Sequence, residues 1–334
     1  MGEKNRMNKV VFFSDLRKLH ESFEQFSFQE FSGKNVPVKL HMGEMKNKFF
    51  PKPDFVKMII DELKILGMKP FLLDTTVAYP GLRRTKIGYQ KLAQIHGFTA
   101  QNVGCDVVID DDGVPTTVEG RIYDVAEHLA SATHIFILSH VKGHIQTGMG
   151  GAIKNLGMGG VTRETKIRIH DGSKPMYQKD TCISCGVCAE RCPFHAITMK
   201  NSSVQLHQRS CFGCGVCVDA CKQKAFRFRD ADLQYLLACS AKACVQKKHV
   251  LYLNEVKRIA RGCDCDPFAG PEICPDIGYL VSTDPVAIDK ASLDLIHNVK
   301  EHLFEKTNKV DPFKQIKYGE AIGLGSSSYH LIEL

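Results

Sequence analysis

Short runs of apolar residues alternate along this chain with longer segments whose apolar residues recur at every third or fourth position. Residues 8–16 and 36–42 are runs of the first kind, which are typical of strands. Residues 53–67 are of the second kind, with an apolar stripe along one helical face and a glycine at the end. The pattern predicts two strands and a helix in the first 67 residues.

The same alternation extends through most of the remaining chain. Further strands are predicted at residues 69–75, 107–110, 134–140, 249–253 and 279–282. Further helices are predicted at residues 84–96, 124–132, 231–247 and 284–297. Strands that alternate with helices of about 10–15 residues predict an α/β fold, in which a mostly parallel sheet carries helices on both faces.

Two copies of one cysteine pattern interrupt this alternation. Each copy has the spacing C-x-x-C-x-x-C-x-x-x-C, starting at Cys182 and at Cys211. Three thiolates two residues apart can reach three corners of one compact iron–sulfur cube, and Gly186 and Gly215 allow the loop to curl around it. Zinc would leave a cysteine of each loop surplus, and disulfides suit small secreted chains. The pattern therefore predicts two 4Fe–4S clusters.

The spacing resembles that of bacterial-type dicluster ferredoxins, in which the fourth cysteine of each run ligates the other cluster. The resemblance implies an α+β ferredoxin-like domain. It assigns the ligand sets Cys182, Cys185, Cys188 and Cys221 to cluster 1, and Cys211, Cys214, Cys217 and Cys192 to cluster 2. The second run departs from the pattern at Lys222, where the first run has Pro193, but that proline donates no ligand.

The length of 334 residues suggests about two domains. We predict one discontinuous α/β domain from residues 1–175 and 246–334. It is interrupted by a ferredoxin insert at residues 176–230 and a connecting helix at residues 231–245. The alternative is two α/β domains in series with the ferredoxin between them. We favour the insertion because the C-terminal part has too few strands of its own.

The apolar runs and the cysteine content indicate in which cellular compartment the protein is expected. No run approaches the roughly 18 apolar residues of a membrane helix, and the apolar block behind the charged N-terminus is too short for a signal peptide. We therefore expect a cytoplasmic protein without a membrane span. The 14 cysteines then indicate metal ligation rather than disulfides, and they suit an anaerobic or strongly reducing cell.

The net charge and its distribution indicate which kind of partner the protein is expected to bind. The formal net charge of +7 falls to about +3 if two clusters with their thiolates are bound. Residues 176–229 contain eight lysines and arginines against three acidic residues. Such a basic rim attracts an acidic redox protein, although a solvated surface that offsets the cluster charge is an equal alternative. Nucleic acid is not expected, because aromatic residues are not interleaved with the basic ones.

Residues 139–160 contain seven glycines directly after a predicted strand, and they include His140, His144 and Lys154. Ligands of open α/β sheets bind beyond the carboxyl ends of strands, and a following helix N-terminus offers amides to an anion. We take the two histidines and the lysine as candidate catalytic residues. Candidate cofactor-binding residues are Gly148, Gly150, Gly151 and Asn155. The alternatives are hydrogen-bonded structural histidines and a solvent-facing lysine.

Five stretches together resemble the DUF362 family, and within it a branch of iron–sulfur centre proteins that carry a dicluster ferredoxin. They are S-H-V-K-G-H from residue 139, G-M-G-G-A-I-K-N-L-G-M-G from 148, C-D-C-D from 263, P-D-I-G from 275 and S-T-D-P-V-A-I-D from 282. The similarity extends over nearly the whole chain. It implies an architecture more than an activity.

A fainter resemblance links residues 144–154 to the H…G-x-x-G-G-x-K stretch of nickel-pincer lactate racemases. It would make Lys154 the cation that faces a cofactor, and His140 or His144 the acid or base. Those racemases carry no ferredoxin insert, so the resemblance is an analogy at the level of the fold.

The remaining cysteines leave several interpretations open. Cys263 and Cys265, with carboxylates beside them, could bind a further metal or form a redox pair, or they could be reduced, partly buried thiols. Further thiols that could join them are Cys239, Cys244 and Cys274. Cys105 is interpreted as structural, and Asp284 as the N-cap of the helix that follows it.

Three functions remain in view. The first is an iron–sulfur oxidoreductase component that carries electrons between an acidic partner and a ligand at the glycine- and histidine-rich segment. The second is an electron carrier or assembly factor without turnover of its own. The third is an isomerase with a metal or small organic cofactor, in which the clusters are structural.

Overall fold

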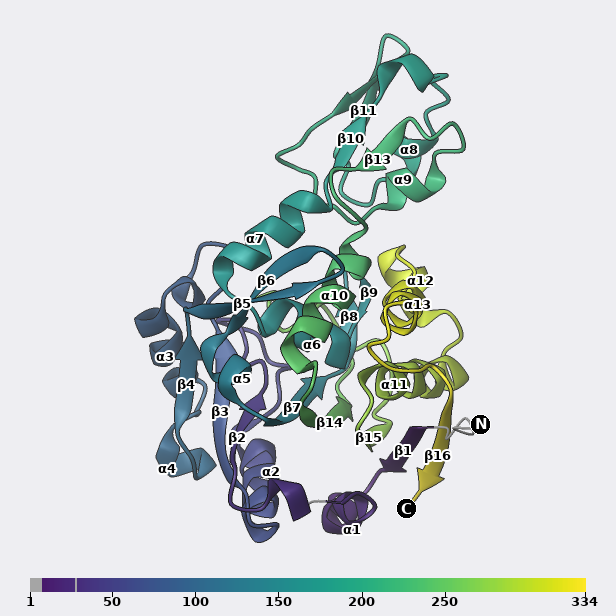
Figure 1. Ribbon diagram of the computed structural model, residues 1–334. Coiled ribbons are helices and arrows are strands. Elements are labelled where there is room, and N and C mark those ends of the chain that lie inside the picture. Colours follow the sequence, from purple (N-terminus) through teal and green to yellow (C-terminus); the bar gives the residue numbers. More distant parts are fainter. Residues whose placement is uncertain (1–7, 28) are drawn as a thin grey trace, which may run out of the picture.

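An eight-stranded sheet runs through the larger part of the molecule (Figure 1). The computed structural model describes residues 8–27 and 29–334. The strands lie in the order β16 (Tyr329–Glu333), β1 (Asn8–Phe13), β15 (Gly278–Ser282), β14 (His249–Val256), β7 (His134–His140), β2 (Asn35–Lys39), β3 (Lys69–Thr75) and β4 (Val107–Asp110). Neighbouring strands run parallel except at β15, which is antiparallel to both β1 and β14. The prediction of a mostly parallel sheet is confirmed.

Successive side chains of a strand enter two different hydrophobic cores, one on each face of the sheet. Along β7, Ile135 and Ile137 belong to the first core, whereas Phe136 and Leu138 belong to the second. The first core includes residues of α6 (Ala152–Gly159), α10 (Leu233–Val245) and α11 (Pro285–Val299). The second includes residues of α1 (Leu19–Glu24), α2 (Pro53–Ile65) and α3 (Lys86–Ile95). Because strand side chains alternate in direction, a strand that is buried along its whole length, such as β7, needs helices on both faces, as predicted.

Seven further α-helices lie in the described part of the chain. They are α4 (Ala100–Val103), α5 (Glu127–Ser131), α7 (Arg163–Gly172), α8 (Val187–Arg191), α9 (Val216–Ala220), α12 (Leu303–Asn308) and α13 (Phe313–Ala321). The Asp284 carboxylate accepts hydrogen bonds from the Val286 and Ala287 amides at 2.8 and 2.9 Å, so its predicted role as the N-cap of α11 is confirmed. Over the described residues, no helix combines the length and the apolar character needed to cross a membrane.

The prediction of a helix over residues 124–132 is wrong in its first part. Residues Arg121–Ala126 form strand β6, which pairs with β5 (Gly113–Val118), and α5 begins only after it. Glu119 and Gly120 connect the two strands with φ angles of 48° and 71°. Two successive residues with positive φ make the tight turn that suits the twist of a hairpin. The apparent helical stripe was the alternation of a strand that continues directly into a short helix.

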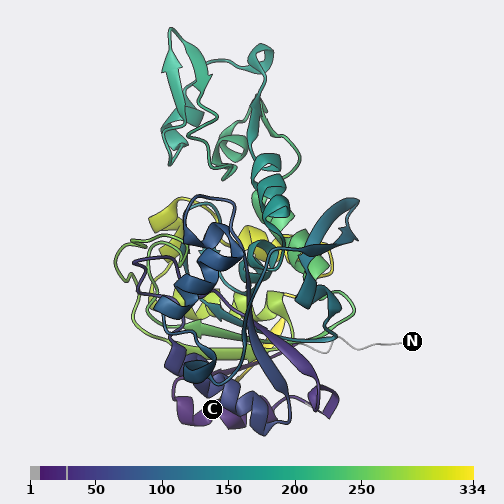
Figure 2. The same cartoon turned by 90° about the vertical axis from the view of Figure 1, so that its left-hand side faces the viewer.

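A small lobe, defined here as residues 175–228, projects from the sheet-containing body (Figures 1 and 2). In it, β10 (Pro175–Tyr177) pairs with β13 (Phe226–Phe228), and β11 (Ile197–Lys200) pairs with β12 (Ser203–Leu206). Both pairs are antiparallel, and α8 and α9 contact each other beside them. The lobe has a hydrophobic cluster of its own, which contains several of its cysteines.

The body is built from chain on both sides of the small lobe. Strands β1–β4 and β7 precede the lobe in the sequence and strands β14–β16 follow it, yet all of them share one sheet. Two helices flank the lobe, α7 before it and α10 after it (Figure 1). The centre of the sheet is the parallel pair of β7 and β14, one strand from each side.

Candidate functional site

A cavity of about 600 Å³ opens at the carboxyl ends of β2, β3 and β7. Lys39 and Asp74 reach it from the ends of β2 and β3. The hairpin of β8 (Lys142–His144) and β9 (Gly148–Gly150) reaches it from the end of β7, followed by helix α6. This edge is where open α/β sheets bind ligands. The cavity therefore lies where the sequence predicted a site.

The wall of the cavity is strongly basic. The lysines and the arginine that line it are Lys39, Arg83, Lys142, Lys154, Lys166 and Lys174, and the histidines are His41, His144 and His170. The acidic residues in the same wall are Asp74 and Asp266. An enclosed site with such an excess of positive groups raises the local concentration of anions. Its charge favours an anionic ligand.

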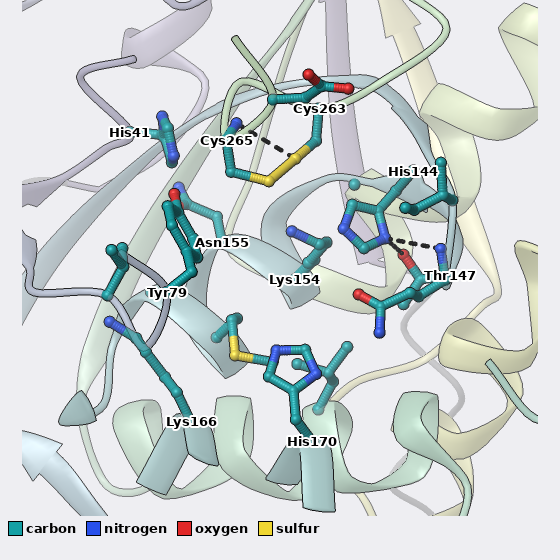
Figure 3. A pocket seen from close by; sticks show the side chains of 18 of the residues that line it. His41, Tyr79, His144, Thr147, Lys154, Asn155, Lys166, His170, Cys263 and Cys265 are labelled. Atoms are coloured by element: carbon teal, nitrogen blue, oxygen red, sulfur yellow. Dashed lines mark hydrogen bonds between the residues drawn. A yellow bond between two sulfur atoms is a disulfide. The ribbon is translucent and has the colours of Figure 1, made fainter. Parts of the chain in front are cut away.

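Lys154 is, with Lys174, one of two cations in this wall whose ammonium groups have no partner among the described residues. It points into the cavity from the first turn of α6 (Figure 3), and within the described residues its ammonium has no hydrogen-bond or ion-pair partner. Burial, followed by the nearby Lys142 ammonium, lowers the pKa of Lys154 to about 7. An amine with this pKa can either donate a proton or accept one near neutral pH, or bind an anion as the ammonium.

His144 faces the same space from β8 and is neutral. Its Nδ1 lies 2.9 Å from the Thr147 hydroxyl and 3.3 Å from the Gln146 amide, so the loop orients the ring (Figure 3). Burial and the nearby Lys154 ammonium hold the pKa of His144 well below its usual range. The imidazole is thus held in place as a neutral group, with its other nitrogen, Nε2, available for a ligand or a proton.

A buried ion network forms the floor of the cavity. The Lys39 ammonium lies 3.0 Å from the Asp74 carboxylate, and the Arg83 guanidinium lies 3.3 Å from it on the other side. Burial alone would raise the pKa of Asp74, but Lys39 and Arg83 lower it. Burial also lowers the pKa of Lys166, to about 7, and its ammonium donates to the Thr75 hydroxyl at 2.5 Å.

Sequence reasoning did not single out these network residues. A signal was present, because Lys39 and Asp74 are charged residues at the carboxyl ends of otherwise buried strands. A charge in that position is expensive to bury unless it is paired, so it indicates a network or a site. Arg83, Lys166 and His170 carried no comparable signal, since each lies on a turn or a helix far away in the sequence.

The candidates of residues 139–160 do not all meet in the cavity. Gly150, Gly151 and Asn155 line it, together with His144 and Lys154. His140 lies outside the lining, because its Nδ1 contacts the Asp264 carboxylate and its Nε2 the Lys257 carbonyl, both at 2.9 Å. With both ring nitrogens engaged, His140 fits the structural alternative rather than an acid–base role. The predicted role of the other residues stays a prediction.

Two further details change the expected site. Gly148 packs against the chain instead of the cavity, since a side chain there would come within 2.6 Å of the Val310 carbonyl. The N-terminus of α6 is not free for an anion, because the Asp289 carboxylate accepts the Ala152 and Ile153 amides at 2.7 and 2.9 Å. The basic side chains, and not these amides, are therefore the groups that can bind an anion.

Cys263 and Cys265 lie in the cavity wall as a disulfide, beside His144 (Figure 3). One ring nitrogen of His144 and the two sulfurs all lie within 4.8 Å of one another. This geometry suits either of the two predicted roles, a metal site or a redox pair. The suggestion that other thiols join this pair is wrong. The first hydrophobic core buries Cys239, Cys244 and Cys274, and among the described residues none of the three belongs to a group of close metal-binding atoms like that of His144 and the two sulfurs.

The eight cysteines of the two runs gather in two places in the small lobe. Cys182, Cys185, Cys188 and Cys221 line one hollow, which brings the fourth cysteine of the second run to the first three. Burial, followed by the proximity of Cys192 and Cys211, raises the pKa of Cys214 to about 11, so Cys192 adjoins the other set. Among the described residues, none of the eight belongs to a group of three ligand atoms within 4.8 Å, the spacing that a single ion requires.

The small lobe contacts the cavity directly. Cys211 and Phe212 belong to the cavity lining, and the Gln146 side chain donates a hydrogen bond to the Phe212 carbonyl. A second contact joins Lys314 of α13 to Asp219 of α9 and to Asp232, at 2.5 and 2.9 Å. One cysteine of the second run is therefore part of the same wall as Lys154 and His144.

Comparison with solved structures finds several similar chains, and two of them are described here, both of low identity. One is the lactate racemase apoprotein from Thermoanaerobacterium thermosaccharolyticum, at 12% identity and a TM-score of 0.39, with 77% of this chain and 53% of that chain covered. The other is a Thermotoga maritima protein, at 11% identity and a TM-score of 0.36, with 71% and 49% covered. This chain thus spans about half the length of each.

Comparison with curated proteins finds no match. A family model described as "Domain of unknown function (DUF362)" matches residues 36–294, which include the strands at the centre of the sheet, the cavity and the small lobe. The narrower resemblance to a branch that carries a dicluster ferredoxin stays a prediction. The resemblance to the DUF362 family is confirmed, and the chain belongs to that family.

Proposed function

We propose that this protein is a cytoplasmic iron–sulfur oxidoreductase component that passes electrons from an acidic redox partner to an anionic ligand in the cavity. The domain division follows the same proposal. Residues 1–175 and 246–334 form the ligand-binding α/β domain, residues 176–230 a dicluster ferredoxin, and residues 231–245 the helix that connects them. A single observation carries the proposal, namely that Cys211 of the second cysteine run lines the cavity that contains Lys154.

The cysteine geometry supports two clusters. The hollow lined by Cys182, Cys185, Cys188 and Cys221 has the crossed composition of a dicluster ferredoxin. The sulfurs of this first set surround a space, and among the described residues no three sulfurs of the two runs come within 4.8 Å of one another as a single zinc ion would require, which suits a polynuclear centre. Backbone amides already donate to the sulfurs, for example from Ala196 to Cys192 at 3.3 Å and from Ala225 to Cys221 at 3.2 Å. Bound 4Fe–4S clusters would supply single electrons, and such amide contacts would tune their potential.

The two cysteine sets differ in exposure, which gives the proposed route a direction. In the first set Cys185 is exposed, and the neighbouring Ile183 side chain is 65% exposed. In the second set Cys214 is partly buried, Cys217 is buried, and Cys211 borders the cavity. Electrons would enter at the exposed first set, where lysines and arginines of the lobe can attract an acidic partner, and leave at the second.

The cavity residues define what the ligand can be. The excess of lysine and arginine side chains favours a carboxylate, a phosphate or a similar anion. The Lys154 ammonium, which has no partner of its own, would bind the anion and supply a proton as the ligand accepts electrons. His144, held neutral by its surroundings, would orient the ligand or accept a proton.

The test is the anaerobic reoxidation of the reduced protein. We expect purified protein to contain about eight irons with labile sulfide. After reduction, small organic anions with reducible groups should reoxidise it, whereas uncharged analogues should do so at least about tenfold more slowly, a difference of about 1.4 kcal/mol in barrier. Lys154→Met should abolish the difference without changing the cluster absorbance. Reoxidation by proteins alone, and by no small anion, would instead favour the carrier or assembly factor.

A further inference from the structure

We propose that Cys263 and Cys265 are a redox-active pair that collects two single electrons arriving at Cys211 and delivers them together to the ligand in the cavity. The inference rests on the proposed function, because it takes the clusters as the source of electrons. It adds a catalytic group to the site. The pair, its neighbours and Cys211 all belong to one cavity wall.

The reason to propose such a pair is that the clusters and the ligand exchange different numbers of electrons. An iron–sulfur cluster gives up one electron at a time, whereas most organic anions are reduced by two. A disulfide and its dithiol differ by two electrons and two protons. A disulfide that borders both the second cysteine run and the ligand space can therefore convert one kind of transfer into the other.

The loop that carries the pair is fixed from below by the residue between the two cysteines. The buried Asp264 carboxylate lies 2.9 Å from the Lys142 ammonium and 2.9 Å from His140 Nδ1. Asn47 also donates to the carbonyls of Cys263 and Asp266, at 3.3 and 2.7 Å. These contacts are independent of the bond between the sulfurs, so the loop can keep its place when the disulfide opens. This assigns His140 a positioning role.

The two sulfurs are not equivalent. Cys263 is only 5% exposed and its Sγ accepts a hydrogen bond from the Cys265 amide at 3.2 Å, whereas Cys265 is more accessible. An amide that donates to a sulfur stabilises its thiolate form. Cys265 is therefore the sulfur that contacts the ligand, and Cys263 is the one that closes the disulfide again.

The reduction balances within the site. The disulfide bond breaks as the pair takes up two electrons, one from each reduced cluster, and two protons from the buffered solvent, giving two thiols. The clusters are reduced again by a low-potential one-electron donor, the acidic redox protein of the proposed function. His144, whose ring nitrogen lies within 4.8 Å of both sulfurs, is placed to pass the protons on. Two-electron reduction of the ligand then restores the disulfide and returns the electrons and protons to the product.

The experiment is a reductive titration of the anaerobically purified holoprotein with dithionite, followed by alkylation and mass analysis of the cysteines. Wild-type protein should take up about four electrons per chain, two in the clusters and two in the pair. Alkylation should label Cys263 and Cys265 only after the titration. The double variant C263S/C265S should keep its cluster absorbance and take up about two electrons. Cys239→Ser, a buried thiol elsewhere in the core, is the matched control and should take up about four.

Other outcomes would overturn the inference. Uptake of only two electrons by wild-type protein that contains its iron and sulfide would do so, as would thiols that are already free in the oxidised protein. A stoichiometric zinc or nickel ion that is lost in Cys265→Ser would assign the pair and His144 to a metal instead. A protein without iron and sulfide would contradict the proposed function itself, which separates the two failures.

Discussion

Among the charged side chains that line the cavity, Lys154 and Lys174 have no hydrogen-bond or ion-pair partner within the described residues, and burial lowers the pKa of Lys154. Lys39, Lys142 and Arg83 each have a carboxylate within 3.3 Å, and Lys166 donates to a hydroxyl. A partly buried ammonium without such a partner lowers the stability of the folded chain, so the presence of Lys154 calls for a ligand that supplies the charge. The sequence alone indicated Lys154 through its glycine-rich surroundings, but it could not tell a paired lysine from an unpaired one.

Replacement of Lys154 by methionine should stabilise the ligand-free protein. The folded pKa of about 7 lies below the ordinary value of 10.5, so the folded chain binds fewer protons between these values and wild-type stability rises with pH there. In urea unfolding at pH 6, we expect the free energy of unfolding of K154M to exceed that of the wild type by about 1–3 kcal/mol. The gain should be smaller at pH 10. The exposed Lys91→Met is the control and should change stability by under about 0.5 kcal/mol. A gain that does not depend on pH would contradict this account.

Asp74 should behave in the opposite way, because it is the acceptor of the buried network. Removing its charge in Asp74→Asn leaves Lys39 buried without a counter-ion and leaves Arg83 only Glu44, at 4.0 Å, and it should cost about 3–5 kcal/mol at pH 7. Since the folded pKa lies below the ordinary value near 4, the wild type loses this contribution as the pH falls below about 4. The difference should therefore shrink in acid. Urea unfolding at pH 7 and pH 3 measures it, with the exposed Asp106→Asn as control.

At the scale of elements, the chain was most predictable where a segment is buried on both sides. The strands over residues 69–75, 107–110 and 134–140 lie where the apolar runs predicted them. The hairpin of β5 and β6 was missed because its strands face solvent on one side and its turn residues, Glu119 and Gly120, are not a common turn pair. The local sequence pattern predicts a strand well only when both faces of the strand are buried and therefore carry apolar residues.

The glycines that begin α8 and α9 offer a matched pair of variants. Gly186 and Gly215 have φ angles of 80° and 81°, so alanine at either position should cost about 1–2 kcal/mol in strain. A side chain at Gly186 would meet open space, but one at Gly215 would come within 2.9 Å of the Phe228 ring. We expect G215A to release its iron at a clearly lower temperature than G186A, measured by anaerobic melting of the cluster absorbance. Equal melting of the two variants would mean that the ring moves aside freely.

At the scale of the whole molecule, the site depends on contacts that no local pattern contains. The repeated cysteine spacing predicted which cysteines come together in the small lobe, and the glycine-rich segment predicted the edge of the sheet where the cavity lies. Neither predicted that Cys211 and Phe212 would close that cavity, because the contact joins segments about 65 residues apart through Gln146. Lys39 and Asp74 each carried a local signal as charged residues at strand ends, but the pairing of the two depends on the order of the strands.

Variants of the fourth cysteine of each run, Cys221 and Cys192, should distinguish the cluster where electrons enter from the cluster where they leave. Cys221→Ser should remove the cluster at the exposed hollow, and Cys192→Ser the cluster next to the cavity, each leaving about four irons. With dithionite as the donor, C221S should still be reoxidised by an anion in the cavity, because the exit beside Cys211 is intact. C192S should be reoxidised at least about tenfold more slowly.

With an acidic redox protein as the donor, the rate of cluster reduction should show the opposite order. C221S should be reduced more slowly than C192S, because C221S loses the exposed acceptor cluster and C192S keeps it. Stopped-flow absorbance under anaerobic conditions measures both steps. If C192S were the faster of the two in the first experiment, electrons would reach the ligand from the other end of the lobe, and the contact between Cys211 and the cavity would have only a structural role.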